Sequence, residues 1–177
     1  MQIRLAETAG FCFGVERAVD LAEKTAGSGV PAATLGPIIH NRHVVARFAA
    51  MGLQEIDSAQ QAQPGQTVIV RAHGIPVSEQ KELAARGAQI VDATCPFVKK
   101  IHVIAQKAEK EGRSLLIIGT PTHPEVMAIA SYSSDAHVFQ SAEALQSWLT
   151  QDEKRASLPF CMVSQTTGTQ KLWESCR

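Results

Sequence analysis

Short apolar runs alternate with longer amphipathic segments along almost the whole chain. The runs have the length of β-strands, and the segments repeat apolar residues at the three- and four-residue spacing of a helix with one buried face. The predicted strands are residues 2–6, 32–39, 53–56, 67–71, 89–91, 114–118, 137–140 and 160–164. The predicted helices are residues 15–24, 42–51, a segment ending near 87, 97–111, 123–131 and 142–149, and residues 166–177 have the pattern of the start of another. This alternation predicts an α/β fold of mainly parallel sheet flanked by helices.

Two of the predicted strands, 67–71 and 114–118, are rich in apolar and β-branched residues along their whole length. Strands of this kind are buried on both faces, as in the centre of a parallel sheet. We expect two α/β lobes, residues 1–96 and 97–177, with the boundary near Pro96 or Phe97. A single continuous sheet would produce a similar pattern and is the alternative.

Composition indicates a globular protein without a strong electrostatic preference. Hydrophobic residues make up 45% of the 177 positions and charged residues 19%, which excludes disorder. The 17 basic residues balance the 17 acidic ones, so no overall field attracts nucleic acid or an anionic membrane, and an anion must be bound by local geometry. No apolar run reaches the length of a membrane span, and the first residues lack the pattern of a signal peptide. We therefore expect a cytoplasmic protein whose four cysteines are thiols or metal ligands.

Residues that could act in catalysis, ligand binding or metal binding directly follow the predicted strands. They are Cys12, His40, His73, Cys95, His123 with Glu125, and Thr166. Ligands of open parallel sheets bind at the carboxyl ends of the strands, so these groups are predicted to face one edge. His43 and His102 fall inside predicted helices, and we interpret them as residues without chemistry.

Cys12 and Cys95 stand in equivalent positions, each directly before a predicted helix. A helix N-terminus stabilises the thiolate form, which is the form that binds metal. The glycines and phenylalanines around Cys12 suggest close approach of a ligand and exclusion of water. Thiolates favour zinc, copper(I) or iron–sulfur, and the two cysteines lack the local pairing of a zinc finger. The alternative is a buried inert thiol, and Cys161 and Cys176 are weak ligand candidates.

Three histidines stand at predicted helix entrances, where backbone donors favour an anion. His40, His73 and His123 together would form a phosphate or diphosphate cradle without lysine or arginine, and the Thr166 and Thr167 hydroxyls would add to it. The alternative for each histidine alone is a structural residue.

Glu125 is the acid within this set. In a dry site its pKa would rise and it would act as a proton donor or relay. The alternative is a glutamate that stabilises the first turn of its helix. Asp92, near Cys95, is interpreted as a structural hydrogen-bonding residue.

Six short motifs of the chain occur in a recognisable order. They are Gly10-Phe11-Cys12-Phe13-Gly14-Val15, His40-Asn41-Arg42, Ala72-His73-Gly74, Asp92-Ala93-Thr94-Cys95-Pro96, His123-Pro124-Glu125 and Gln165-Thr166-Thr167. From Met1 to about Thr167 the chain resembles the 4-hydroxy-3-methylbut-2-enyl diphosphate reductases, the LytB/IspH family. Each motif alone is weak, and six at similar spacings make the resemblance specific.

The resemblance implies α/β lobes around a central iron–sulfur cluster, expected to be 4Fe–4S, with Cys12 and Cys95 as ligands. It implies that an allylic diphosphate is held by His40, His73, His123 and Thr166. Glu125 would supply the proton with which the allylic hydroxyl leaves as water. Two electrons, from a donor such as ferredoxin or flavodoxin, and a further proton would give isopentenyl and dimethylallyl diphosphate.

The resemblance also implies a third lobe, with a third cluster cysteine and further serine and asparagine ligands, that is absent from this chain. Cys176 follows the Gln165-Thr166-Thr167 motif too soon to be that cysteine. We expect a fragment, a frameshifted gene product or a chain completed by another polypeptide, and an open apolar edge that favours self-association.

Two other functions fit the residues. One is a catalytically silent α/β domain that binds a diphosphate or a partner protein through its histidine-lined edge. The other is a zinc hydrolase that uses cysteine, histidine and glutamate, although the chain has no His-Glu-x-x-His pair.

Overall fold

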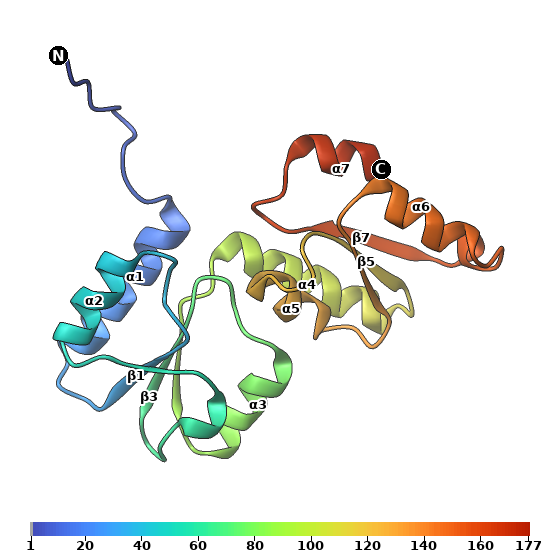
Figure 1. Ribbon diagram of the computed structural model, residues 1–177. Helices are drawn as coiled ribbons and strands as arrows, with labels where there is room; N and C mark the ends of the chain where they lie inside the picture. Colours follow the sequence, from blue (N-terminus) through green and yellow to red (C-terminus); the bar gives the residue numbers. More distant parts are fainter. Residues whose placement is uncertain (1) are drawn as a thin grey trace.

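Two separate parallel sheets organise residues 2–177, the part of the chain that the computed structural model describes (Figure 1). The first sheet has the strand order β2-β1-β3-β4, and the second has the order β6-β5-β7. The strands of the first are β1 Ala32–Leu35, β2 Gln54–Ile56, β3 Thr67–Val70 and β4 Gln89–Asp92. Those of the second are β5 Ser114–Ile118, β6 Ala136–Phe139 and β7 Phe160–Ser164. Every pairing within them is parallel, so the predicted α/β class is confirmed and the single continuous sheet is wrong.

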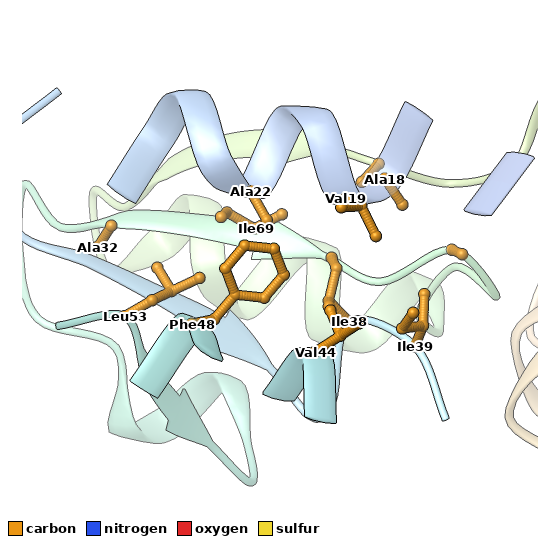
Figure 2. Packing of buried hydrophobic residues seen from close by; sticks show 12 residues of the cluster. Ala18, Val19, Ala22, Ala32, Ile38, Ile39, Val44, Phe48, Leu53 and Ile69 are labelled. Atoms are coloured by element: carbon orange, nitrogen blue, oxygen red, sulfur yellow. The ribbon is translucent and has the colours of Figure 1, made fainter. Parts of the chain in front are cut away.

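Helices cover both faces of the first sheet. One face carries α1 Phe13–Ala26 and α2 Arg42–Ala50, and the other carries α3 Val77–Ala85 and a short 3-10 helix, η1 Ala59–Gln61. Figure 2 shows the ring of Phe48 from α2 and Ala22 from α1 packed around Ile69 of β3. Val68 and Val70 point to the opposite face. A central strand buried on both sides explains the unbroken apolar run.

The second sheet is built in the same way. Helices α4 Pro96–Lys110 and α5 Pro124–Ala130 cover one face, and α6 Ala142–Thr150 and α7 Gln170–Cys176 cover the other. A second 3-10 helix, η2 Arg155–Ser157, precedes β7. Leu115 and Ile117 of β5 pack under α4 and α5, and Leu116 and Ile118 pack under α6 and α7. The lobe boundary near Pro96 stays a prediction.

The N-terminal segment differs from its prediction. Residues 2–6 form no strand, and Ile3 and Leu5 are 82% and 86% exposed. The segment extends away from the first sheet (Figure 1). Alternating apolar residues specify a strand only where they pair with a neighbouring strand, and residues 2–6 pair with neither sheet. The second predicted strand ends early, at Leu35, because Gly36 turns the chain with a φ of +67°.

Polar contacts join the two sheets. The Val77 N–H donates to Ser131 Oγ at 3.0 Å, and Gln80 Nε2 donates to the Tyr132 hydroxyl at 2.8 Å. His102 of α4 stacks on Tyr132 with ring centroids 4.7 Å apart. We call these contacts of Val77, Gln80, His102, Ser131 and Tyr132 the inter-sheet seam. The seam orients the carboxyl edges of both sheets toward a common site.

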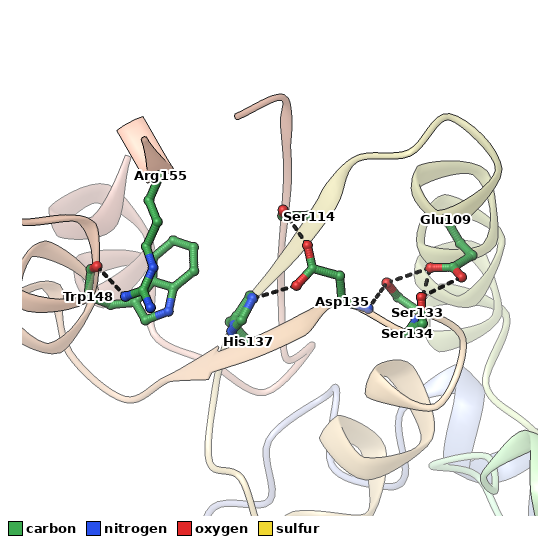
Figure 3. A network of polar contacts seen from close by, with 8 residues as sticks. All are labelled: Glu109, Ser114, Ser133, Ser134, Asp135, His137, Trp148 and Arg155. Carbon is green, nitrogen blue, oxygen red and sulfur yellow. Dashed lines mark hydrogen bonds and ion pairs between the residues drawn. The ribbon is translucent and has the colours of Figure 1, made fainter. Parts of the chain in front are cut away.

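A second polar network lies around the start of β5 (Figure 3). Glu109 of α4 accepts hydrogen bonds from Ser133 and Ser134, and Asp135 accepts one from Ser114 Oγ and contacts His137 Nε2 at 2.7 Å. The Ser114 hydroxyl is the largest cause of the lowered pKa of Asp135. The network anchors α4 to the second sheet and lies at the opposite end of β5 from the candidate site.

Candidate functional site

The site residues lie where the strand order of each sheet reverses. From β1 the chain proceeds to β2 on one side and then to β3 on the other, and His40 and His73 follow β1 and β3. In the second sheet β5 lies between β6 and β7, with His123 after β5 and Thr166 after β7. Such reversal points are where open parallel sheets bind ligands. Each sheet therefore contributes one binding edge.

The three predicted histidines meet in space. The ring centroids of His40 and His73 are 4.9 Å apart, and those of His73 and His123 are 5.3 Å apart and nearly perpendicular at 85°. We call these three residues the histidine cluster. His40 and His73 also line a cavity of about 280 Å³ with Phe11, which directly precedes Cys12. The cavity connects the histidine cluster with the cysteine loop.

Helix caps fix the orientation of this cluster. Asn41 begins α2 by accepting hydrogen bonds from the His43 and Val44 N–H groups, which holds the backbone beside His40. His123 begins α5, and its Nδ1 accepts the Glu125 N–H at 3.2 Å. Because Nδ1 is an acceptor, the proton of the neutral ring is on Nε2, which becomes a donor for an anion.

His73, the central ring, is neutral at ordinary pH. Burial, aided by His40, His123 and Arg71, lowers its pKa to about 4. Its Nδ1 is buried without a hydrogen-bond partner. Neighbouring cationic groups would repel one another in the empty cluster, whereas an anion between them would relieve that repulsion.

We expect acid to weaken the ligand-free protein and to strengthen its binding of inorganic diphosphate. The folded-state pKa of His73, about 4, is below the unfolded value of 6.5. The contribution of neutral His73 to the free energy of unfolding is therefore fully present above about pH 6.5 and is lost as the pH drops toward 4. Bound diphosphate raises this pKa and makes binding take up a proton. Thermal unfolding with and without diphosphate, between about pH 8 and about pH 6, measures the effect. The ligand-induced shift in Tm should grow on acidification in the wild type and in the exposed-site control His43→Gln, and should grow less in His73→Gln, which keeps His40 and His123. An equal, pH-independent shift in all three proteins would contradict it.

Glu125 lies buried beside the histidine cluster, with 1% of its surface exposed. Its two carboxylate oxygens accept hydrogen bonds from Thr166, one from the backbone N–H at 2.6 Å and one from the hydroxyl at 2.8 Å. Thr166, predicted as a substrate ligand, therefore donates its hydroxyl to Glu125. The pair connects the carboxyl ends of β5 and β7 and holds an acid at a fixed point of the site.

Cys12 and Cys95 begin α1 and α4, and neither side chain accepts a hydrogen bond from its helix. Cys12 is exposed and Cys95 is half-buried. A Cβ atom added to Gly14 would lie 2.5 Å from Cys95 Sγ, so the turn that carries Cys12 lies against Cys95. Each sulfur thus stands beside helix N–H groups that no side chain caps. The two loops therefore come together as predicted.

The surroundings of Cys12 differ from their prediction in three respects. No strand precedes Cys12, because residues 2–6 are not a strand. Gly14 has helical backbone, and its close neighbour is the Cys95 sulfur, not a free space for a ligand. Phe11 and Phe13 are 46% and 62% exposed, so within residues 2–177 these rings do not enclose the thiol.

Gly14→Ala is expected to destabilise the fold, although alanine is the better helix former. The helix propensity gain of about 1 kcal/mol is outweighed by the collision with Cys95, so we expect the free energy of unfolding to fall by about 1–2 kcal/mol. Chemical denaturation measures the change. Asp20→Ala, at an exposed position of α1, is the matched control and should not destabilise. A more stable Gly14→Ala variant would show that the contact is absent.

Cysteine is the residue type that binds iron–sulfur clusters, and Cys12 and Cys95 would supply two ligands where such a cluster usually takes three or four. Within residues 2–177, no group of three or more histidine, cysteine and acidic side chains is arranged to hold a metal ion. Cys161 and Cys176 pack in the hydrophobic cores of the second sheet, as expected for weak ligand candidates. Asp92 accepts the Thr94 N–H at 3.0 Å and pairs with Lys99, which confirms its structural role.

The sequence did not predict the close packing of Gly74, the residue after His73, against His102. Gly74 has a φ of +75°, and a Cβ there would lie 2.7 Å from the Cε1 atom of His102. His102 is buried, its Nε2 has no partner, and burial lowers its pKa to about 4. A glycine directly after a site histidine was the available signal. His102 is thus a core residue, and His43 is exposed.

Comparison with known proteins agrees with this arrangement. A sequence model described as "LytB protein" matches residues 3–177. A 4-hydroxy-3-methylbut-2-enyl diphosphate reductase of Nitratidesulfovibrio vulgaris is 38% identical over all of this chain and 63% of its own length. One of Clostridioides difficile is 37% identical over 99% of this chain and 62% of its own length. This chain thus spans somewhat less than two thirds of these relatives.

Solved structures give the same result. A structure titled as (E)-4-hydroxy-3-methyl-but-2-enyl diphosphate reductase, the terminal enzyme of the non-mevalonate pathway, has a TM-score of 0.81 and 34% identity, and the match covers 98% of this chain and 61% of that one. The reductase of Plasmodium falciparum has a TM-score of 0.83 at 25% identity, over 96% of this chain and 53% of that one. Among residues 2–177, no helix has both the length and the apolar character needed to cross a bilayer. With a family match over nearly its whole length, the chain belongs to the LytB protein family.

Proposed function

We propose that this chain provides the cysteine and histidine part of a reductase that converts 4-hydroxy-3-methylbut-2-enyl diphosphate to isopentenyl and dimethylallyl diphosphate. The reaction consumes two electrons and two protons and releases the allylic hydroxyl as water. The observation that carries the proposal is the convergence of His40, His73 and His123, from two sheets, beside a buried acid and two cysteine loops.

The histidine cluster is the proposed diphosphate site. Neutral imidazoles donate hydrogen bonds, and protonated ones add charge when the anion arrives. Nε2 of His123 is available for this role because Nδ1 is occupied by the Glu125 N–H. The cluster needs no lysine or arginine, in keeping with a chain of zero net charge.

Glu125 is the proposed proton donor, and Thr166 orients it. Both Thr166 hydrogen bonds restrict the buried carboxyl group to one position, and a positioned carboxyl group is a common proton donor in catalysis. Because the Thr166 hydroxyl donates its hydrogen to Glu125, it would contact the substrate as an acceptor, from the allylic hydroxyl and not from the diphosphate oxygens.

Cys12 and Cys95 are the proposed ligands of an iron–sulfur cluster. When bound, such a cluster supplies electrons and a Lewis-acidic iron. The supporting observations are the free helix N–H groups at both thiols and the contact between their loops. A small donor such as ferredoxin or flavodoxin, in the cytoplasm, is the proposed source of electrons.

A second candidate function is diphosphate binding without reduction. It is favoured by one observation: the histidine cluster is formed entirely within this chain, whereas the cysteines supply two ligands to a cluster that usually takes three or four.

Anaerobic purification and iron–sulfur reconstitution test both candidates. The reductase proposal predicts a brown protein that turns over the allylic diphosphate with a chemical reductant. A colourless protein stabilised by inorganic diphosphate would favour the second candidate. Stoichiometric zinc in freshly isolated protein would instead support a hydrolase and overturn the assignment of Cys12 and Cys95 to an iron–sulfur cluster.

A further inference from the structure

One side chain joins the helices that begin at the two cysteines. Arg17 extends from α1 to the loop between β4 and α4, where Nη1 donates to the Thr94 carbonyl and Nη2 donates to the Asp92 carbonyl, each at 3.2 Å. Thr94 directly precedes Cys95, and Arg17 lies one helical turn after Cys12 and Phe13. The guanidinium thus bridges the two thiol-bearing segments.

The loop between β4 and α4 is held in place by its own contacts. Asp92 Oδ1 accepts the Thr94 N–H at 3.0 Å, Lys99 pairs with Asp92, and the Cys95 N–H donates to the Ala72 carbonyl at 2.9 Å. These contacts fix Cys95 relative to the first sheet. They do not involve α1, so they leave the position of Cys12 undetermined.

The start of α1 has few other restraints. Cys12 is exposed, and the preceding segment extends away from the first sheet. The fully buried core contacts of α1 are made by Ala18, Val19 and Ala22, further along the helix, and in the first turn Val15 packs, partly buried, against the same core. At its first turn, the contact of Gly14 with Cys95 limits how closely the loops approach, and the Arg17 bridge prevents their separation.

We propose that Arg17 is a positioning residue that holds the Cys12 thiol at a fixed separation from the Cys95 thiol. The role rests on the proposed function, in which both thiols bind one cluster. A planar guanidinium reaches two carbonyls at once with its forked N–H groups, whereas a lysine ammonium at this position would reach one of them. Arginine is therefore the required residue type.

The test uses the iron-free chain, so that it does not depend on a loaded enzyme. Dibromobimane, a short reagent that bridges two nearby thiols, is added, and bridged Cys12–Cys95 peptides are quantified by mass spectrometry. We expect bridging in Arg17→Gln to be at least about fivefold slower than in the wild type, with Arg17→Lys between them. Arg47→Gln is the control, since Arg47 forms an exposed ion pair of α2 with Glu23 and does not contact the cysteine loops.

Two further measurements keep the result decisive. Alkylation of each thiol by a monofunctional reagent should proceed at the same rate in all variants, because Arg17 sets distance and not reactivity. Thermal unfolding shows whether Arg17→Gln folds, and if it does not, Arg17→Lys decides. Equal bridging in the wild type and the folded Arg17 variants, or no bridging in the wild type, would overturn the proposal. A wild type that bridges its thiols but stays colourless after reconstitution would instead refute the cluster assignment alone.

Discussion

Cys95→Ser is expected to abolish the brown colour of the reconstituted protein without weakening the fold. The serine hydroxyl stays protonated near neutral pH and is a much poorer ligand of an iron–sulfur cluster than a thiolate, so the absorbance and the spin signal of the cluster should be lost. Cys95 begins α4 and makes no capping hydrogen bond, whereas serine is among the best residues at that position. The free energy of unfolding should therefore stay the same or rise by up to about 1 kcal/mol.

Optical spectra after anaerobic reconstitution and chemical denaturation of the iron-free protein measure the two effects. Cys12→Ser should behave in the same way, because Cys12 begins α1 without a cap. Cys176→Ser, in the last turn of α7, is the control and should remain brown. A coloured Cys95→Ser protein would show that the centre lies elsewhere.

Glu125→Gln is expected to lower turnover about 10²- to 10⁴-fold while the fold and diphosphate binding persist. Glutamine has nearly the same shape, and its carbonyl can still accept the Thr166 N–H, while the Thr166 hydroxyl can turn to accept from the amide. It cannot supply a proton. Turnover with a chemical reductant and the Tm shift caused by inorganic diphosphate separate the two roles.

The control for this variant is Glu143→Gln. Glu143 occupies the same position in the first turn of α6 as Glu125 does in α5, but it is exposed. Both variants lose the favourable interaction of a carboxylate with the helix N-terminus. If Glu143→Gln lowered turnover as much as Glu125→Gln, the loss would be a general effect of helix stability, and the role of Glu125 as a proton donor would be rejected.

Much of the fold follows from local pattern. The predicted strands 114–118 and 160–164 have the observed bounds of β5 and β7. β5 is buried along its whole length and β7 packs, mostly half-buried, against the cores on both faces of the sheet, so each is an apolar run between polar turns. Residues 2–6 also have a strand-like pattern, of alternating apolar residues, but no partner strand. Pairing is a property of the tertiary structure, which a local pattern does not contain.

The candidate site was also predictable from the sequence only in part. Strand ends explain why His40 and His73 lie together, because parallel strands of one sheet point their carboxyl ends in one direction. His123 follows a strand of the other sheet, so its approach to His73 also depends on how the two sheets pack. The contacts of Gly14 with Cys95 and of Arg17 with Thr94 join residues more than seventy positions apart. They depend on how α1 packs on the sheet. A glycine or an arginine in the sequence does not indicate which distant residue it contacts.

The inter-sheet seam has a mechanical consequence. His40 and His73 belong to one sheet and His123 to the other, so the width of the cradle is set by how one sheet is tilted against the other. The contacts that join the sheets lie away from the cradle and include the hydrogen bond from Gln80 of α3 to the Tyr132 hydroxyl, after α5. A small rotation of one sheet against the other at this contact would open or narrow the grip on a bound anion without any change in the residues that touch it.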